Sequence, residues 1–277
     1  MLTLNDEIEQ LLENVDGDTE IARKTKELPE KTQKYYVHGE LVAICITWEN
    51  EIHPFALYFT VYEKNAQNET LNLKILHHIR QKALKSNKDR LITRDFAPQG
   101  HFNRWLQMQN FKLVRTTVEP QIATKDVHVQ NEKIQFQTAH QVKQNSYLLK
   151  QLVSKCYARY KQVHMINPVA SMSRERWQKI IFQDQIDSAP LITIKKDEIL
   201  AYEFLFEDAT NLVTLGWNGQ NVSGELNKLQ NIQFQWIKER YEFIGGEFDS
   251  TDELAIETSK NWNFPKEKRY ETFIKML

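Results

Sequence analysis

The amino-acid sequence predicts an α/β (α+β) chain built from two similar domains in tandem. Segments in which every second residue is apolar, a pattern typical of strands, are followed along the chain by segments with apolar residues at helical spacing. Local features of the first half also recur in the second half, in the same order and about 155 residues later. The length of 277 residues is sufficient for two domains of ordinary size.

The composition indicates a folded chain without a broad charged surface. Hydrophobic residues make up 41% and aromatic residues 11%, which is enough for a substantial core. The formal net charge of −1 argues against nucleic-acid and anionic-membrane partners, because both bind broad basic surfaces. Cys45 and Cys156 stand in apolar surroundings and are predicted to be buried free thiols.

The beginning of the chain and its hydropathy favour a cytoplasmic protein with no membrane contact. Met1–Glu7 lacks the basic and apolar regions of a secretory signal peptide. No window approaches the length of about 18 apolar residues that a membrane helix needs.

The first half begins with helical spacing and continues with alternating strands and helices. Residues 4–34 carry Ile8, Leu11, Leu12 and Ile21 on one apolar stripe and are predicted to be helical. The following elements are predicted in this order: strand 40–49, strand 54–63, helix 70–86, strand 90–96, helix 101–109 and strand 111–119.

Residues 120–132 show little periodicity and are predicted to be a linker, after which the pattern starts again. A short strand is predicted at Ile134 and Phe136. The elements predicted after it are helices 145–161 and 173–185, strands 191–195, 199–206 and 212–217, helix 226–240, strand 243–248, helix 252–260 and strand 270–274.

Four pairs of segments carry the repeat, one of which is Glu49–Asn50 and Glu207–Asp208, each at the end of a predicted strand. Gly39–Ala43 matches Asp197–Ala201, and Thr93–Phe96 lies opposite Glu247–Ser250. Asn110 and Asn263 each stand between an amphipathic helix and a strand and are each followed by phenylalanine. Asparagine is the residue after glycine that most often ends a helix in the left-handed conformation, so both are predicted to be helix C-caps.

The order of elements in each half resembles the GNAT acyltransferase superfamily, in which an antiparallel hairpin leads into a strand followed directly by a helix. The resemblance implies two tandem GNAT-like domains, each a mixed, mostly antiparallel central sheet flanked by helices. It places an N-terminal domain at 1–122 and a C-terminal domain at 133–277. In the family, the strand–helix loop reads Q/R-x-x-G-x-G/A, and its backbone amides bind the pyrophosphate of acetyl-CoA, as helix N-termini generally bind anions.

The first cofactor loop departs from the family pattern throughout. It falls on residues 63–71, contains no glycine, and carries Glu63 and Glu69, whose charges oppose a phosphate. The resemblance therefore implies that the N-terminal domain has a degenerate cofactor loop.

The second loop keeps one motif position of three and is the better candidate for cofactor binding. Aligning Gly224 with the first motif glycine places Asn221 at the Q/R position and Leu226 at the last small position. Gly224 begins a helix, where amides can meet an anion, or it only supplies an unusual backbone angle for the turn. The candidate cofactor-binding residues are Trp217, Asn218, Gly219, Gln220, Asn221, Val222, Ser223, Gly224 and Glu225.

The family tyrosine that protonates the leaving thiolate has no counterpart here. Counting back from Phe111 and from Phe264 gives Leu106 and Ser259, and neither side chain is a usual general acid. The acid and base must therefore come from other residues or from water.

Glu247 and Asp249 are the candidate catalytic residues, because carboxylates gather at the end of the strand that precedes the last helix, where the family places the acyl acceptor. The alternative is that Asp249, Ser250 or Thr251 caps the next helix. Glu203 and Glu207 are further candidates, with a solvent-facing position on an antiparallel sheet as the alternative. The histidines are scattered and form no metal-binding pattern.

The resemblance implies an acyl-CoA-dependent N-acyltransferase that uses acetyl-CoA as co-substrate and acts on a small-molecule or peptide amine. One alternative is a non-catalytic GNAT-like protein that binds a ligand or partner, which the departures in both loops favour. Another is transfer of an amino acid from a charged tRNA, which requires a basic patch and is disfavoured by the near-zero net charge.

Overall fold

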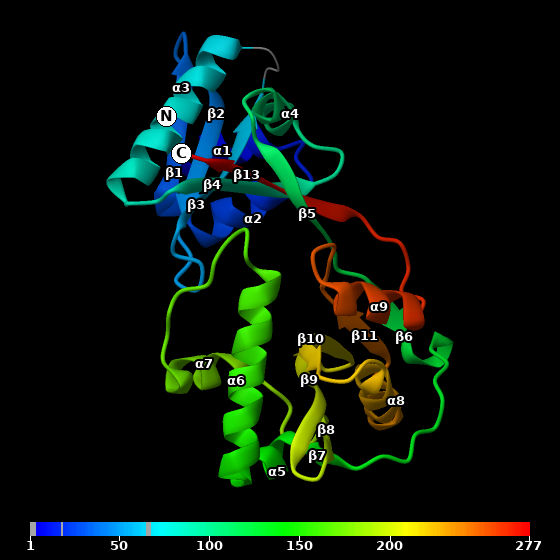
Figure 1. The fold of residues 1–277 in the computed structure, drawn as a ribbon. Helices are drawn as coiled ribbons and strands as arrows, with labels where there is room; N and C mark the ends of the chain where they lie inside the picture. The colour runs from blue at the N-terminus through cyan, green and yellow to red at the C-terminus, as the bar shows by residue number, and fades with distance from the viewer. Residues whose placement is uncertain (1–3, 18, 65–67) are drawn as a thin grey trace. The chain divides into compact units, whose positions relative to one another are not determined.

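The computed structural model describes residues 4–17, 19–64 and 68–277, so part of the first predicted cofactor loop, residues 65–67, lies outside the described residues. The chain forms two compact units (Figure 1). Unit 1 comprises residues 1–116, 166–170 and 268–277, and unit 2 comprises residues 117–165 and 171–267. Within the described ranges, no helix is both long enough and apolar enough to cross a membrane.

Unit 1 is built on a sheet with the strand order β1-β2-β3-β4-β13-β5. The pairs β1–β2, β2–β3 and β4–β13 are antiparallel, whereas β3 and β4 are parallel over a short stretch. The strands are β1 (Thr32–Val37), β2 (Glu40–Trp48), β3 (Ala56–Glu63), β4 (Arg90–Phe96), β5 (Lys112–Val118) and β13 (Arg269–Met276).

Helices cover both faces of this sheet, and strand β2 shows why. Ala43 and Cys45 of β2 belong to the core beneath α3 (Glu69–Lys85) and α4 (His101–Met108). Ile44 and Ile46 point the other way, toward α1 (Leu4–Leu12) and α2 (Glu20–Glu27). Because both faces are covered, β2 is apolar at nearly every position.

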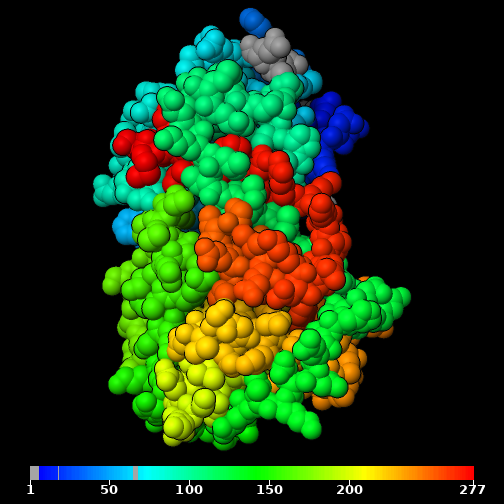
Figure 2. Space-filling model, turned by 45° about the vertical axis from the view of Figure 1, so that its right-hand side comes forward, coloured from blue at the N-terminus to red at the C-terminus, as the bar shows by residue number. Residues whose placement is uncertain are grey.

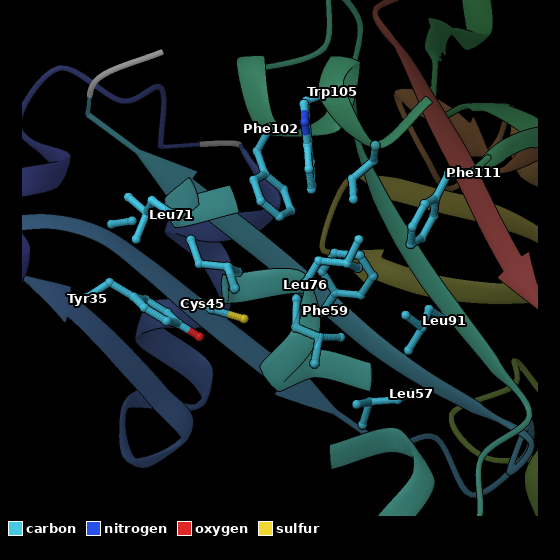
Figure 3. Packing of buried hydrophobic residues seen from close by; sticks show 14 of the residues in the cluster. Tyr35, Cys45, Leu57, Phe59, Leu71, Leu76, Leu91, Phe102, Trp105 and Phe111 are labelled. Atoms are coloured by element: carbon cyan, nitrogen blue, oxygen red, sulfur yellow. The ribbon is translucent and has the colours of Figure 1, made fainter. Parts of the chain in front are cut away.

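The larger core of unit 1 lies under α3 and α4. Figure 3 shows its side chains, with Phe102 and Trp105 of α4 directed toward the strands. Phe59 of β3 and Phe111 meet edge to face, with ring centroids 5.9 Å apart. Phe273 of the C-terminal strand is buried in the same cluster, so the end of the chain completes this core.

Unit 2 has a second mixed sheet with the strand order β6-β11-β10-β9-β8-β7, in which only β10 and β11 are parallel. A two-residue strand, β12 (Phe248–Asp249), pairs with residues 117 and 118. The other strands are β6 (Gln121–Ala123), β7 (Phe136–Thr138), β8 (Pro190–Lys195), β9 (Glu198–Ala209), β10 (Leu212–Gln220) and β11 (Phe243–Gly246).

Helices also cover both faces of the second sheet. One face packs on α5 (Ala139–Gln144), α6 (Ser146–Val163) and α7 (Arg174–Ile181). The other face packs on α8 (Glu225–Ile237) and α9 (Glu253–Asn261). The predicted mixed, mostly antiparallel sheets flanked by helices are therefore confirmed in both units.

Each sheet contains a strand that comes from a distant part of the sequence. The final strand, predicted at 270–274, pairs with β4 along its whole length, from Tyr270 opposite Phe96 to Met276 opposite Arg90. Conversely, β6 follows directly after β5 in the sequence but pairs with β11. The predicted linker 120–132 thus holds a strand and the turn η2 (Thr124–Asp126), both too short to give a periodic signal.

The beginning of the chain differs from the prediction of a continuous helical segment over residues 4–34. The helical region is broken into α1, α2 and η1 (Pro29–Lys31), and Thr32–Val37 forms β1 instead. Pro29 limits α2, because a residue that precedes proline is disfavoured in the helical region. The β-favouring sequence from Thr32 to Val37 then pairs with β2.

Both asparagines end their helices as predicted, each directly after the C-cap residue, which is Gln109 in α4 and Trp262 in α9. Asn110 has φ 64° and Asn263 has φ 54°, the left-handed conformation that ends a helix. The following residues close the same type of turn: Phe111 N donates to Leu106 O, and Phe264 N donates to Ser259 O, both at 3.1 Å. The two predicted repeats therefore share a backbone motif as well as a sequence pattern.

We predict that Phe273→Ala lowers the free energy of unfolding of unit 1 by roughly 3–5 kcal/mol, the usual effect of removing a buried phenylalanine. Met276→Ala, on the same strand at a residue that is 57% exposed, is the control and is expected to change it by less than about 0.5 kcal/mol. Urea unfolding of both variants is the measurement. Equally small effects would show that β13 is dispensable for the core of unit 1.

Candidate functional site

Strand β10 extends past its parallel neighbour and leaves one of its edges open. The β10–β11 pairing runs from Leu212 opposite Phe243 to Leu215 opposite Gly246, where β11 ends. β10 continues to Gln220 and is paired over that stretch with β9. Among the described residues, no strand pairs with the other edge of β10 after Leu215. The sheet therefore has an opening at this point.

A β-bulge lies at the start of the opening. Leu215 is opposite Leu205 and Asn218 is opposite Glu203, so Gly216 and Trp217 together face one residue of β9. The bulge also reverses the face of the sheet to which the side chains after it point.

Val213 and Leu215 pack under α8 and α9, whereas Trp217, two residues further on, packs on the opposite face against Trp177 of α7, with ring centroids 5.8 Å apart. The corresponding pair β2–β3 of unit 1 keeps its register without a shift from Ala43 opposite Glu63 to Trp48 opposite Tyr58. Only the second sheet thus combines diverging parallel strands with a bulge in this part of the described chain.

Glycine is concentrated around the opening: of the eight glycines, five are Gly216, Gly219, Gly224, Gly245 and Gly246. At Gly216 a Cβ atom would lie 2.3 Å from a ring carbon of Phe206, so no side chain fits there. At Gly219 it would lie 2.6 Å from the hydroxyl oxygen of Tyr202. Aromatic packing on the face of the sheet therefore fixes glycine at both positions.

The predicted cofactor-binding residues fall into three parts. Trp217, Asn218, Gly219 and Gln220 are the last residues of β10, whereas Asn221, Val222 and Ser223 form an exposed turn. Gly224 is the N-cap of α8 and Glu225 is its first residue. The segment around these residues, yellow to orange, forms part of the surface seen in Figure 2. The structure thus brings all nine residues to one end of β10.

Gly224 has the unusual backbone angle that is the alternative to an anion-binding role. Its φ is +82°, and a Cβ atom there would meet nothing within 4 Å. The amides that follow already have acceptors: Glu225 N donates to Val222 O at 3.2 Å, and Leu226 N donates to Gln220 Oε1 at 3.1 Å. An anion at this helix start would take the place of the Gln220 side chain.

Side-chain amides hold the turn before α8. Asn221 Nδ2 donates to Ile199 O at 2.8 Å, and Asn221 N donates to Leu200 O at 2.7 Å. Next to the helix start lies a cavity of about 470 Å³. It is lined by Ile134, Gln135, Thr193, Ile194, Lys195, Lys196, Leu200 and Glu225.

The two predicted catalytic carboxylates lie at the end of β11, on either side of Phe248. Glu247 is exposed, directly after β11. Asp249 lies in β12, is half-buried, and accepts a hydrogen bond from the hydroxyl of Thr117.

The cap of α9 is Asp252 rather than Asp249, Ser250 or Thr251. Its carboxylate accepts from Leu254 N at 3.0 Å and from Ala255 N at 3.4 Å, and it forms an ion pair with Arg159 of α6. The helix begins at Glu253, so Asp249, Ser250 and Thr251 lie three, two and one residues before the cap position.

Glu203 is fully buried, so the solvent-facing alternative is wrong for this residue, whereas Glu207, four residues later, is exposed. Glu203 Oε1 accepts from Gln230 Nε2 at 3.0 Å and from Asn218 Nδ2 at 3.4 Å. Burial raises the pKa of Glu203 to about 8, because the charged form loses its hydration. At neutral pH the carboxyl group is therefore mostly protonated.

One signal in the sequence could have identified Glu203. It is the one polar residue between Ile199 and Phe206, apart from the hydroxyl of Tyr202. An apolar run of this length predicts a strand covered on both faces, and a carboxyl group inside such a run is buried on either face.

Unit 1 offers less at the equivalent position. Glu63, at the end of β3, is buried, and burial raises its pKa. Asn68 caps α3, since its Oδ1 accepts from Leu71 N at 3.0 Å. Phosphate binding is not favoured here, because the strand ends in a glutamate and the first amides of the helix are already capped by an asparagine.

The described residues hold no group of three or more histidine, cysteine, aspartate or glutamate side chains that could bind a metal ion. Both cysteines are buried free thiols, as predicted.

Comparisons with known proteins identify the fold. No protein-family model matches the chain, and no curated protein matches it. A GCN5-related N-acetyltransferase from Sphaerobacter thermophilus superposes with a TM-score of 0.61 at 12% identity, covering 98% of this chain and 91% of that one. A tandem GNAT protein from the clavulanic acid biosynthesis pathway gives 0.54 at 8% identity, covering 92% and 86%.

A conserved protein of unknown function from Staphylococcus epidermidis gives a TM-score of 0.55 at 8% identity, covering 91% of this chain and 97% of that one. The chain therefore has the GNAT fold, as its sequence predicted. At these identities the likeness extends to the fold alone.

We predict that Glu203 makes unit 2 less stable as the pH rises from about 4.5 to about 8. The pKa of this group is near 4.5 in the unfolded chain and about 8 in the folded one. Below both values the folded and unfolded forms are protonated alike. Between them only the unfolded chain ionises, so the free energy of unfolding falls by about 1.4 kcal/mol per pH unit, and it levels off above the folded value.

Glu203→Gln removes this titration while keeping the shape of the neutral acid. Urea unfolding between pH 5 and pH 8, followed by tryptophan fluorescence, is the measurement, and Glu207→Gln on the same strand is the control. The stability of Glu203→Gln relative to wild type should increase steadily over this range. Parallel pH profiles for the two proteins would mean that Glu203 is ionised in the folded state.

Proposed function

We propose that this protein is an acyl-CoA-dependent N-acyltransferase, with acetyl-CoA as co-substrate and its site in unit 2. The observation that carries the proposal is the bulge at Gly216 and Trp217, at the point where β10 leaves β11. Bulges occur preferentially beside active sites, where they turn backbone groups out of the ladder. Two of the structural neighbours are named as GNAT proteins, one of them as an N-acetyltransferase, which supports the reaction class.

The open edge of β10 suits an extended donor. Its backbone from Gly216 to Gln220 has a partner strand on one side only. Unpaired amides at such an edge can donate to the amide groups of a pantetheine arm, as they would to another strand. An amide of the bulge can likewise stabilise the negative charge that develops on a thioester carbonyl oxygen.

The transfer forms a C–N bond between the amine and the acyl carbon, breaks the C–S bond of the thioester so that CoA leaves as a thiolate, which takes up a proton from water, and releases one proton from the amine. Glu247, exposed after β11, is the proposed acceptor of that proton, directly or through water. Asp249 is held by the hydroxyl of Thr117 and is proposed to orient the end of β11. The acceptor is a small-molecule or peptide amine.

The start of α8 is proposed to bind the pyrophosphate, with the nine residues Trp217–Glu225 as the cofactor segment. We propose one such site per chain, in the C-terminal domain at 133–277. The N-terminal domain at 1–122 has Glu63 buried at the corresponding strand end and Asn68 bound to the start of its helix.

A non-catalytic ligand- or partner-binding protein is the second candidate function. The start of α8 favours it, because Gln220 Oε1 already accepts from Leu226 N and the Glu225 carboxylate lies in the first turn. A negative charge there opposes a pyrophosphate.

We predict that acetyl-CoA binds once per chain and that Gly224→Arg abolishes this binding. The arginine side chain would fill the space at the helix start. It also costs roughly 1–2 kcal/mol of stability, because Gly224 has φ +82°. Calorimetry with acetyl-CoA measures the binding, and thermal melts measure the stability.

Gly39→Arg is the matched control. Gly39 has φ +83° with nothing within 4 Å, so this substitution has the same backbone strain, and it lies in unit 1. It is expected to lower stability equally and to leave acetyl-CoA binding unchanged. Absence of binding to the wild type would rule out the acyltransferase and favour the non-catalytic function, whereas two equal sites would contradict the assignment to unit 2.

A further inference from the structure

A cluster of polar side chains is buried between the second sheet and its covering helices. Glu203 of β9 accepts hydrogen bonds from Asn218 of β10 and from Gln230 of α8, and Gln230 Nε2 also contacts Thr258 Oγ1 of α9 at 2.8 Å. Gln233 of α8 donates to the backbone oxygen of Glu203 at 2.8 Å. One carboxyl group thus connects two strands and two helices in an otherwise apolar layer.

The cluster is not fully satisfied. Glu203 Oε2, Asn218 Oδ1 and Gln233 Oε1 are buried and have no hydrogen-bond partner among the described residues. Each buried polar atom left without a partner costs about 1–3 kcal/mol, and apolar side chains of the same shape would avoid that cost. Such a cluster is more consistent with a role in the site than with a role in stability.

Its position connects it to the proposed site. Asn218 is the first residue of β10 after the bulge and lies directly opposite Glu203 in the ladder. Two residues further on, Gln220 binds the start of α8. The contact between Glu203 and Asn218 therefore anchors the strand segment that borders the opening.

We infer that Glu203 is a positioning residue of the proposed acyltransferase site, which holds Asn218 and the open edge of β10 in place only while it carries its proton. This inference rests on the proposed function.

The surroundings of Glu203 account for the dependence on the proton. The groups that face it are Asn218 from β10, Gln230 from α8 and, through Gln230, Thr258 from α9, and none of them ionises. Among the described residues, no cation forms an ion pair with it, and burial raises its pKa to about 8. Above that pH the carboxylate is a buried charge without a counter-charge, which draws in water or moves the segment that holds it.

The experiment measures the affinity for acetyl-CoA by calorimetry between pH 7 and pH 9.5, so that no acceptor has to be known. The wild type should lose affinity above about pH 8, by up to tenfold per pH unit. Glu203→Gln keeps the neutral acceptor and should bind within twofold of the wild type at pH 7, with a flat profile up to pH 9.5. A merely structural residue would not give this rescue at high pH.

Two further variants complete the test. Glu207→Gln, on the same strand but exposed, should follow the wild-type profile. Asn218→Ala removes the partner instead of the acid, and it should bind more weakly at pH 7 and show no loss above pH 8. This variant decides the question if Glu203→Gln does not fold.

The possible failures are distinguishable. If the wild type binds no acetyl-CoA at any pH, the proposed function fails and this inference fails with it. If the wild type binds and Glu203→Gln or Asn218→Ala shows the same loss above pH 8, the function stands and the role of Glu203 is overturned.

Discussion

The four-residue parallel pairing of β10 with β11 is the constraint on which the proposed site depends. All the other described pairings in that sheet are antiparallel. The parallel pairing stops at Leu215, so β10 has an open edge from Gly216 onward. Unit 1 also has a short parallel pairing, from Ala56 opposite Arg90 to Tyr58 opposite Ile92, but the hairpin of β2 and β3 beside it has no bulge. Both units therefore have a short parallel pairing next to an open strand edge, but only unit 2, among the described residues, also has a bulge there.

Two strands, β13 and β6, pair with strands that are distant from them in the sequence. The formation of each sheet therefore depends on contacts between distant parts of the chain. β13 is the last element of the chain and pairs along its whole length with β4, about 180 residues earlier. β6 follows β5 but belongs to the other sheet. Unit 1 cannot complete its core until the end of the chain is available, since Phe273 is part of that core. Sequence distance of this kind slows folding, because the entropy of closing a long loop is lost before the contacts form.

The sequence was informative where one local rule decides the outcome. Alternation and apolar runs located β2, β3 and β9, and the preference of asparagine for the left-handed conformation located both helix ends at Asn110 and Asn263. It failed where a long-range contact decides: Thr32–Val37 is a strand only because β2 pairs with it. The bulge at Gly216 is a property of the register between two strands, which no single segment records. Glu203 was misplaced because an antiparallel sheet suggested one solvent face, whereas helices cover both.

In this glycine-poor chain, asparagine and glutamine residues lie at helix starts and ends, where glycine is common in other proteins. The side-chain amide of Asn68 binds the start of α3 and that of Gln220 binds the start of α8, whereas Asn110 and Asn263 end helices through a left-handed backbone. At the start of α8, an anion would have to replace the side-chain amide of Gln220 as the hydrogen-bond acceptor. A neutral hydrogen bond such as that from Leu226 N to Gln220 contributes about 0.5–1.5 kcal/mol net, whereas one to a charged acceptor contributes about 1.5–3 kcal/mol. A phosphate oxygen can therefore displace the Gln220 side chain from this amide. The carboxylate of Glu225 acts against that gain, but it is neutralised in part by Lys228, whose Nζ lies 2.7 Å from its Oε1. In the proposed site, the absence of the GNAT motif glycines thus changes which group bonds to the helix start, whereas the attraction of a helix N-terminus for an anion does not depend on them.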